Sequence, residues 1–75
     1  MQRNEFFKKL ANEIELEDSV NETSVLADIE EWDSLAAVTA LAFFKKHLGL
    51  NVPADSLKTC KTIGDILDLG NQNYN

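Results

Sequence analysis

The sequence predicts an all-α domain: a four-helix bundle with a short third helix and a long loop between the first two helices. Two runs of apolar residues recur at steps of three and four residues, which is helical periodicity. Capping residues precede such runs, and glycines follow them. The 75 residues are enough for one small core. We therefore expect a single domain over residues 1–75, ordered over about 4–69, with a frayed polar tail at 70–75.

The first predicted helix covers residues 4–16, with Asn4 as its N-cap. Its apolar stripe consists of Phe6, Phe7, Leu10, Ala11 and Ile14. A long connection, residues 17–32, follows. Its own apolar residues are expected to hold it on the core, with one short helical turn between Val25 and Ile29.

The second predicted helix, residues 34–48, has the strongest pattern. We expect its buried stripe to be Leu35, Val38, Leu41, Phe44 (or Ala42) and Leu48. Basic residues fill its last turn, where the helix dipole favours positive charge, and Gly49 ends it. The apolar run is shorter than the ~20 residues of a membrane span.

Pro53 marks a short extended link before the third helix, which starts at Ala54 or Asp55 and ends near Thr59. Ser56 is interpreted as a structural cap of this helix. Thr62 and Asp65 have the spacing of a capping box, so a fourth helix begins there. Ile63, Ile66, Leu67 and Leu69 form its apolar face, and Gly70 ends it.

Charge and cysteine content limit the possible functions. The net charge is −6, and nine acids with no Lys or Arg lie between Glu13 and Asp33. Such a segment repels nucleic acid and attracts basic partners, or it only keeps the protein soluble. The single Cys60, expected to be a small core residue, excludes an internal disulfide, and no metal-ligand spacing occurs. We expect a cytoplasmic monomer without a membrane span or a metal.

Asp33 and Ser34 stand where the acidic segment meets the second helix. Both residue types cap helices, and Ser34 is expected to be the N-cap. A phosphate on Ser34 would also lie beside the unpaired N–H groups of the first turn. Asp33, Glu30 and Glu31 would offer a negative surface to a modifying enzyme, and Asp33 could help bind a metal that this enzyme carries.

Two segments carry a resemblance to a known family. Trp32-Asp33-Ser34-Leu35 with its apolar helix, and Thr62-Ile63-Gly64-Asp65, resemble acyl carrier proteins, and the likeness extends over residues 6–69. The resemblance implies that a phosphopantetheinyl transferase esterifies Ser34 with 4′-phosphopantetheine from coenzyme A. The thiol of this arm would carry an acyl, aminoacyl or peptidyl thioester. Leu35 and Ala42 match positions that face partner enzymes. A second tripeptide, Asp55-Ser56-Leu57, matches the start of the third helix instead.

The chain also departs from the family pattern. Residues 34–48 contain no acid, whereas many fatty-acid carriers display several glutamates there. Trp32 replaces the small residue common before the Asp, as in carriers of amino acids. Both differences favour a specialised pathway with its own partners over general fatty-acid synthesis.

We therefore predict an acyl carrier protein, not an enzyme, that serves fatty-acid, lipid or specialised biosynthesis with acyl-loading and acyl-consuming enzymes as partners. The alternatives are an aminoacyl or peptidyl carrier, and a helical docking module without an arm, which binds a partner through the acidic loop and the face of Leu35 and Ala42. A serine hydrolase is rejected because His47 lies about 20 Å along the helix from Ser34. Some core residues could line an acyl channel or simply fill the core: Leu41, Phe44, Ile66 and Leu69.

Overall fold

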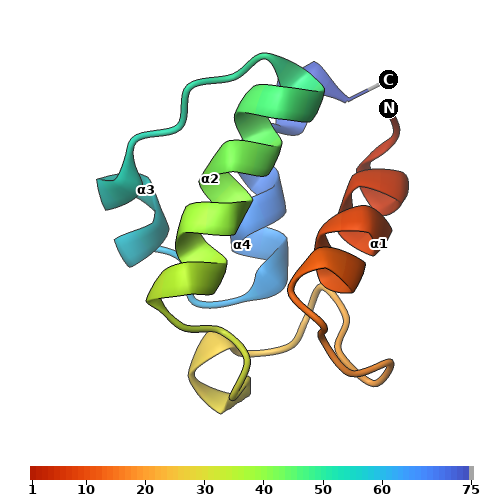
Figure 1. Cartoon of the computed structure of the whole chain (residues 1–75), viewed down its shortest axis with the longest axis vertical. Helices are drawn as coiled ribbons and strands as arrows, with labels where there is room; N and C mark the ends of the chain where they lie inside the picture. Colours follow the sequence, from red (N-terminus) through yellow and green to blue (C-terminus); the bar gives the residue numbers. More distant parts are fainter. Residues whose placement is uncertain (75) are drawn as a thin grey trace.

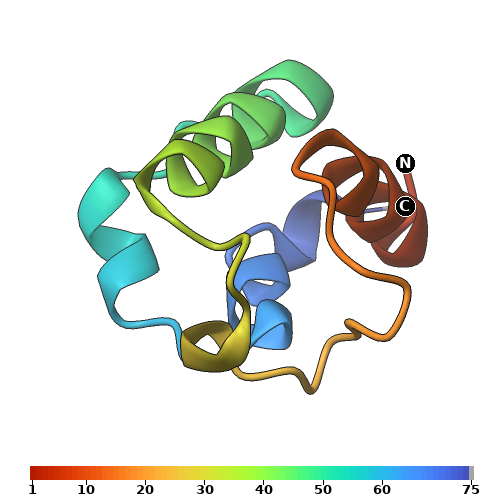
Figure 2. The same ribbon diagram turned by 60° about the horizontal axis from the view of Figure 1, so that its bottom comes forward.

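The computed structural model describes residues 1–74, which form helices around one core (Figure 1). The elements are α1 (Arg3–Glu13), η1 (Leu26–Asp28), α2 (Ser34–Leu48), α3 (Ala54–Lys58), α4 (Ile63–Asp68) and η2 (Asn71–Asn73). The all-α prediction, the short third helix and the long first loop are confirmed. The two ends of the chain lie close together in both ribbon views (Figures 1 and 2). No helix within residues 1–74 is long and apolar enough to cross a membrane.

The core is built around Phe6 of α1, whose side chain is fully buried. Its ring lies 5.0 Å from that of Phe44 and 6.1 Å from that of Phe43, between ring centroids. Tyr74, from the end of the chain, lies 5.7 Å from the same ring. The largest fully buried side chains are Phe6, Phe44, Ile66 and Leu67. Helices α1, α2 and α4 thus share one apolar centre.

Helix α1 is shorter than predicted, and Asn4 is not its cap. The helix starts at Arg3, after Gln2, whose side chain makes no capping hydrogen bond. It ends at Glu13 because Glu15 turns into the left-handed region, with φ of 57°. The N–H of Leu16 then donates to Ala11 O at 2.9 Å, which closes a Schellman-type end. A glycine usually occupies this position, so no residue type at position 15 signals the end of the helix.

Arg3 joins three parts of the chain. Its guanidinium donates to Glu22 Oε1 at 2.8 and 3.0 Å and to the carbonyl of Gly64 at 3.2 Å. It also pairs with Asp68 of α4 at 2.8 Å. At Gly64 a Cβ atom would lie 3.0 Å from the carbonyl oxygen of Glu22, so the loop and α4 are in close contact there. This close approach leaves little room for a side chain, which explains why residue 64, between Ile63 and Asp65, is glycine.

The long connection is fixed to the fourth helix by its backbone. The N–H of Leu26 donates to Lys61 O at 2.8 Å, and the N–H of Ile63 donates to Ser24 O at 3.1 Å. Leu26, the first residue of η1, and Ile29, which follows η1, are buried in the core. The predicted helical turn near Val25 to Ile29 is confirmed, and the loop has a defined path.

The predicted buried stripe of α2 is wrong at its N-terminal half. Leu35 and Val38 are 74% and 61% exposed, whereas Ala36, Ala40 and Phe44 face the core. Alanines at a four-residue step leave room for α1 to pack closely against α2. The bounds of α2 and its end at Gly49, in the left-handed conformation with φ of 64°, are as predicted.

Ser56 does not cap α3. Pro53 occupies the N-cap position, and Ser56 lies inside the helix. Its carbonyl accepts hydrogen bonds from the hydroxyl of Thr59 at 3.0 Å and the thiol of Cys60 at 3.4 Å. Cys60 is half-buried against the core, and this burial raises the pKa of its thiol. The thiol therefore stays protonated and weakly nucleophilic at neutral pH.

The tail contains more structure than the expected frayed segment. Helix α4 ends at Asp68, before Gly70, and the chain continues into η2. The hydroxyl of Tyr74 donates to Leu67 O at 2.9 Å, and burial raises the pKa of Tyr74 to about 12. A Cβ atom at Gly70 would lie 2.9 Å from Leu48 Cδ1 and 3.0 Å from Phe44 Cε1, so these side chains would have to shift to admit a larger residue. Asn75 lies outside the described residues.

The capping box at the start of α4 is confirmed and has a measurable consequence. Asp65 Oδ2 accepts from the N–H groups of Lys61 at 2.9 Å and Thr62 at 3.1 Å. Thr62 Oγ1 accepts from the N–H of Asp65 at 3.1 Å. The bonds from Lys61 and Thr62 to the carboxylate lower the pKa of Asp65 in the folded state.

A group whose pKa is lowered by folding stabilises the fold above its unfolded pKa, about 4 for Asp. This stabilisation is lost as the pH falls below that value through the folded pKa. We expect Asp65→Asn to unfold at lower urea concentration than the parent at pH near 7, with the difference narrowing toward about pH 2. Asp28→Asn, which removes an exposed carboxylate from η1, is the control. If the urea midpoints of Asp65→Asn and the parent differed by the same amount at every pH, the role of the Asp65 carboxylate would be contradicted.

Candidate functional site

The start of α2 presents Ser34 differently from the prediction. Asp33, with extended backbone, is the N-cap, and its Oδ1 accepts from the N–H of Ala36 at 2.9 Å. Ser34 is the first residue of the helix, and it is exposed. The expectation that Ser34 itself caps the helix is therefore wrong. Because Asp33 performs the capping, the hydroxyl of Ser34 is left for other chemistry.

The atoms around Ser34 fit a phosphodiester. Within residues 1–74, the Ser34 hydroxyl and the N–H groups of Ser34 and Leu35 have no hydrogen-bond partner. These N–H groups belong to the first turn of a 15-residue helix and carry its partial positive charge. An anion bonded to Ser34 Oγ would lie beside them, as anions do at other helix N-termini.

One side of Ser34 is an open, mostly apolar hollow of about 450 Å³ between α2 and α3. Its walls are Trp32, Asp33, Ser34, Ala37, Val38, Leu41, Ala54, Leu57 and Lys58. The buried side chain of Leu57 and the half-buried ring of Trp32 connect it to the core. Ser34 stands at the rim of this surface, which we call the α2/α3 hollow.

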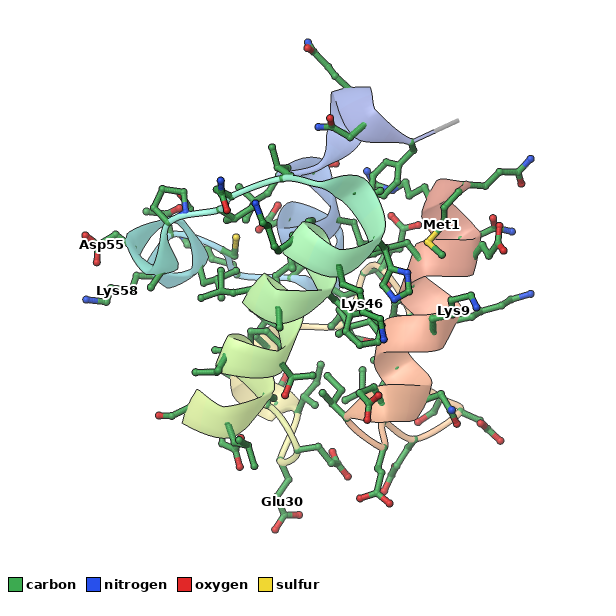
Figure 3. All side chains as sticks on the ribbon, turned by 45° about the horizontal axis from the view of Figure 1, so that its top comes forward. Met1, Lys9, Glu30, Lys46, Asp55 and Lys58 are labelled. Carbon is green, nitrogen blue, oxygen red and sulfur yellow. The ribbon has the colours of Figure 1, made fainter. Side chains whose placement is uncertain are left out.

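The other side of Ser34 is acidic. A second hollow, of about 290 Å³, is lined by Glu13, Ile14, Glu15, Glu31, Asp33, Leu35, Ala36 and Thr39. Glu30 is exposed and extends from the loop before α2, away from the helices (Figure 3). The structure thus brings Glu31, Asp33 and Leu35 together, as the sequence suggested, with Glu30 next to Glu31 on the loop.

Ala42 is exposed but lies two turns farther along α2. It lines a separate hollow with Lys45 and the link before α3, at residues 50–53. Leu35, Val38 and Ala42 are the exposed apolar residues of α2. Their steps of three and four residues place them along one side of the helix.

The α2/α3 hollow brings to the site residues that were not predicted there, among them Val38, Leu57 and Lys58. The predicted stripe includes Val38 because of its helical spacing with Leu35 and Leu41. The spacing of Ala36, Ala40 and Phe44 is the signal that could have corrected this assignment. Nothing in the sequence indicated that Lys58 and Ser34 line one hollow, since this depends on how α3 packs.

Other groups with catalytic or metal-binding potential lie away from Ser34. His47, at the opposite end of α2, packs its ring 4.8 Å from that of Phe43. Within residues 1–74, no cluster of three or more His, Cys, Asp or Glu side chains has the geometry to hold a metal ion.

Comparison with known proteins gives one match. A family model described as "Phosphopantetheine attachment site" matches residues 7–69, which include all of α2, α3 and α4. No curated protein and no solved structure matches the chain. The match covers more than half of the chain and includes the exposed serine at the start of α2.

Proposed function

The chain belongs to the phosphopantetheine-binding carrier family, and on this basis we propose that it carries acyl intermediates as thioesters on an arm attached to Ser34. Membership makes the chain a non-catalytic carrier domain with covalent 4′-phosphopantetheine as its cofactor. Such domains are modified by phosphopantetheinyl transferases and interact with loading enzymes. The choice of Ser34 depends on one observation: its free hydroxyl is exposed beside two unpaired N–H groups of α2.

Each residue at the start of α2 has a distinct task in this proposal. Ser34 Oγ forms a phosphodiester bond with the phosphopantetheine of coenzyme A, the adenosine bisphosphate part leaves, and the hydroxyl proton is released. Asp33 holds the first turn through Ala36 and leaves one carboxylate oxygen for the metal of the transferase. When attached, the arm supplies the thiol that holds the cargo as a thioester.

The acidic side of Ser34 would guide basic partners, with Glu30, Glu31 and Asp33 in reach of an enzyme that approaches the serine. Leu35 would supply apolar contact, since it is 74% exposed and adjacent to Ser34. Ala42 would extend this contact along α2.

The cargo we propose is an acyl group of fatty-acid, lipid or specialised biosynthesis. A specialised pathway is favoured because α2 carries no acid and ends in Lys45 and Lys46. An aminoacyl or peptidyl cargo is the second candidate, and Trp32 beside Asp33 favours it.

Modification of the apo protein tests this function. We expect incubation with coenzyme A and a broad-specificity phosphopantetheinyl transferase to add one phosphopantetheine per chain, seen by intact-protein mass spectrometry. Fragmentation should place the added mass on the peptide that contains Ser34. If no transferase modifies the protein while it still binds a partner protein, the non-covalent docking module is the better description. If the arm is added, the mass of holo protein isolated from its native cell would distinguish acyl from aminoacyl cargo.

A further inference from the structure

Among residues 1–74, Lys58 is the one cation that lines the α2/α3 hollow at whose rim Ser34 stands. Lys58 closes α3, and its Nζ lies 3.2 Å from Asp55 Oδ1, one turn earlier on the same helix. Both side chains point out from α3 into solvent (Figure 3). They are 78% and 88% exposed, so their ion pair is weak and easily exchanged for another partner.

The walls of the hollow suit a chain that is anionic at one end and apolar next to it. Val38 and Leu41 of α2 face Leu57 of α3, with Trp32 beside the serine. Val38 is 61% exposed, so this apolar surface lacks a partner within residues 1–74. Within the described part of the chain, Asp33 is the only acid on this lining, and its carboxylate caps α2. Asp55 of α3 is not among the walls.

The phosphopantetheine arm has the matching chemistry. It begins with a phosphodiester, which carries one negative charge, and continues with a dimethyl-substituted carbon and two amides. Because the arm would be tethered at the rim, its effective concentration at the hollow is high. Contacts of low affinity are therefore enough to hold it there. The phosphodiester would be attracted to a flexible ammonium on the same lining, since Lys acts as a compact point charge on a long stem.

We propose that Lys58 is a positioning residue for the arm: it exchanges Asp55 for the phosphodiester on Ser34 and holds the arm in the α2/α3 hollow between encounters with enzymes. This inference rests on the proposed function, since it requires the arm on Ser34. The proposal gives the two sides of Ser34 different roles. Partner enzymes approach from the acidic side, and the arm rests in the α2/α3 hollow beside Lys58.

The single tryptophan of the chain makes the test direct, because Trp32 lines the hollow. Apo and holo protein would be compared, the holo form being made with coenzyme A and a phosphopantetheinyl transferase. We expect attachment to shift the emission of Trp32, to reduce its quenching by acrylamide and to shift the side-chain NMR signals of Lys58. An exposed ion pair changes an equilibrium by about two- to fivefold, so Lys58→Met should lower the ratio of docked to free arm by that factor.

Three matched variants complete the test. Lys58→Arg keeps the charge and should restore the docked arm. Asp55→Asn removes the competing carboxylate and should increase docking. Lys8→Met, on α1 and outside the hollow, should behave as the parent.

The three ways in which this proposal can fail are distinguishable. If Ser34 gains the arm but the signals of Trp32 and Lys58 stay as in the apo form, the storage role is wrong and the carrier function stands. If Lys58→Met docks the arm as well as the parent, Lys58 does not position it. If no phosphopantetheine is added at all, the proposed function fails and the storage role fails with it.

Discussion

Ser34→Ala is expected to abolish attachment of phosphopantetheine, a complete loss of the added mass rather than a slower reaction. The attacking atom, Ser34 Oγ, is removed, and no neighbouring hydroxyl can replace it: the next residues of α2 are Leu35 and Ala36. The fold should survive, because Asp33 and not Ser34 caps the helix. Alanine is also a strong helix former at an exposed position. Intact mass after incubation with coenzyme A and transferase measures the effect.

The chain supplies a matched control in Ser56→Ala. Asp55-Ser56-Leu57 repeats the tripeptide of Asp33-Ser34-Leu35, so a transferase that read only three residues would modify both serines. Ser56, however, is half-buried and lies inside the five-residue α3, after Pro53 as N-cap. Ser56→Ala should therefore gain one phosphopantetheine, as the parent does. If the mass persisted on Ser34→Ala and vanished on Ser56→Ala, the site assignment would be reversed.

Features with local causes could be predicted from the sequence. The bounds of α2 follow from its apolar run and from Gly49, which adopts the left-handed conformation at its end. The capping box of Thr62 and Asp65 depends on two residues three positions apart. The exposed serine at a helix start also has a local origin, since a loop meets a helix there.

Features that depend on packing between elements could not be predicted. The buried face of α2 is set by how closely α1 approaches, which favours Ala36 and Ala40 over the larger Leu35 and Val38. The early end of α1 depends on Glu15 in a conformation that usually requires glycine. Lys58 lines the same hollow as Ser34 because α3 packs beside α2. The acidic side of the site could therefore be predicted from the sequence. The α2/α3 hollow, with its apolar walls and Lys58, could not.

Phe6→Ala should be among the most destabilising substitutions in the chain. The side chain is fully buried, and its ring touches rings from the middle of α2 and from the tail. Removing a buried phenylalanine costs about 3–5 kcal/mol through lost burial and the cavity that remains. A domain of this size is stable by about 4–11 kcal/mol in all, so the variant should lose a large share of its stability. Urea unfolding followed by circular dichroism would measure the loss.

Phe7→Ala is the matched control, because it removes an identical side chain one position along the same helix. Phe7 is half-buried and lines an open hollow between α1 and the long loop, so it leaves no enclosed cavity. Its removal should lower the free energy of unfolding by less than half as much as Phe6→Ala does.

Phe6→Ala should also release Tyr74, whose hydroxyl donates to Leu67 O and whose ring packs on Phe6. The pKa of Tyr74, about 12 when buried, should then fall toward 10 in an ultraviolet titration. Equal losses at Phe6 and Phe7 would mean that the core is not centred on Phe6. An unchanged Tyr74 would mean that the tail is held by Leu67 alone.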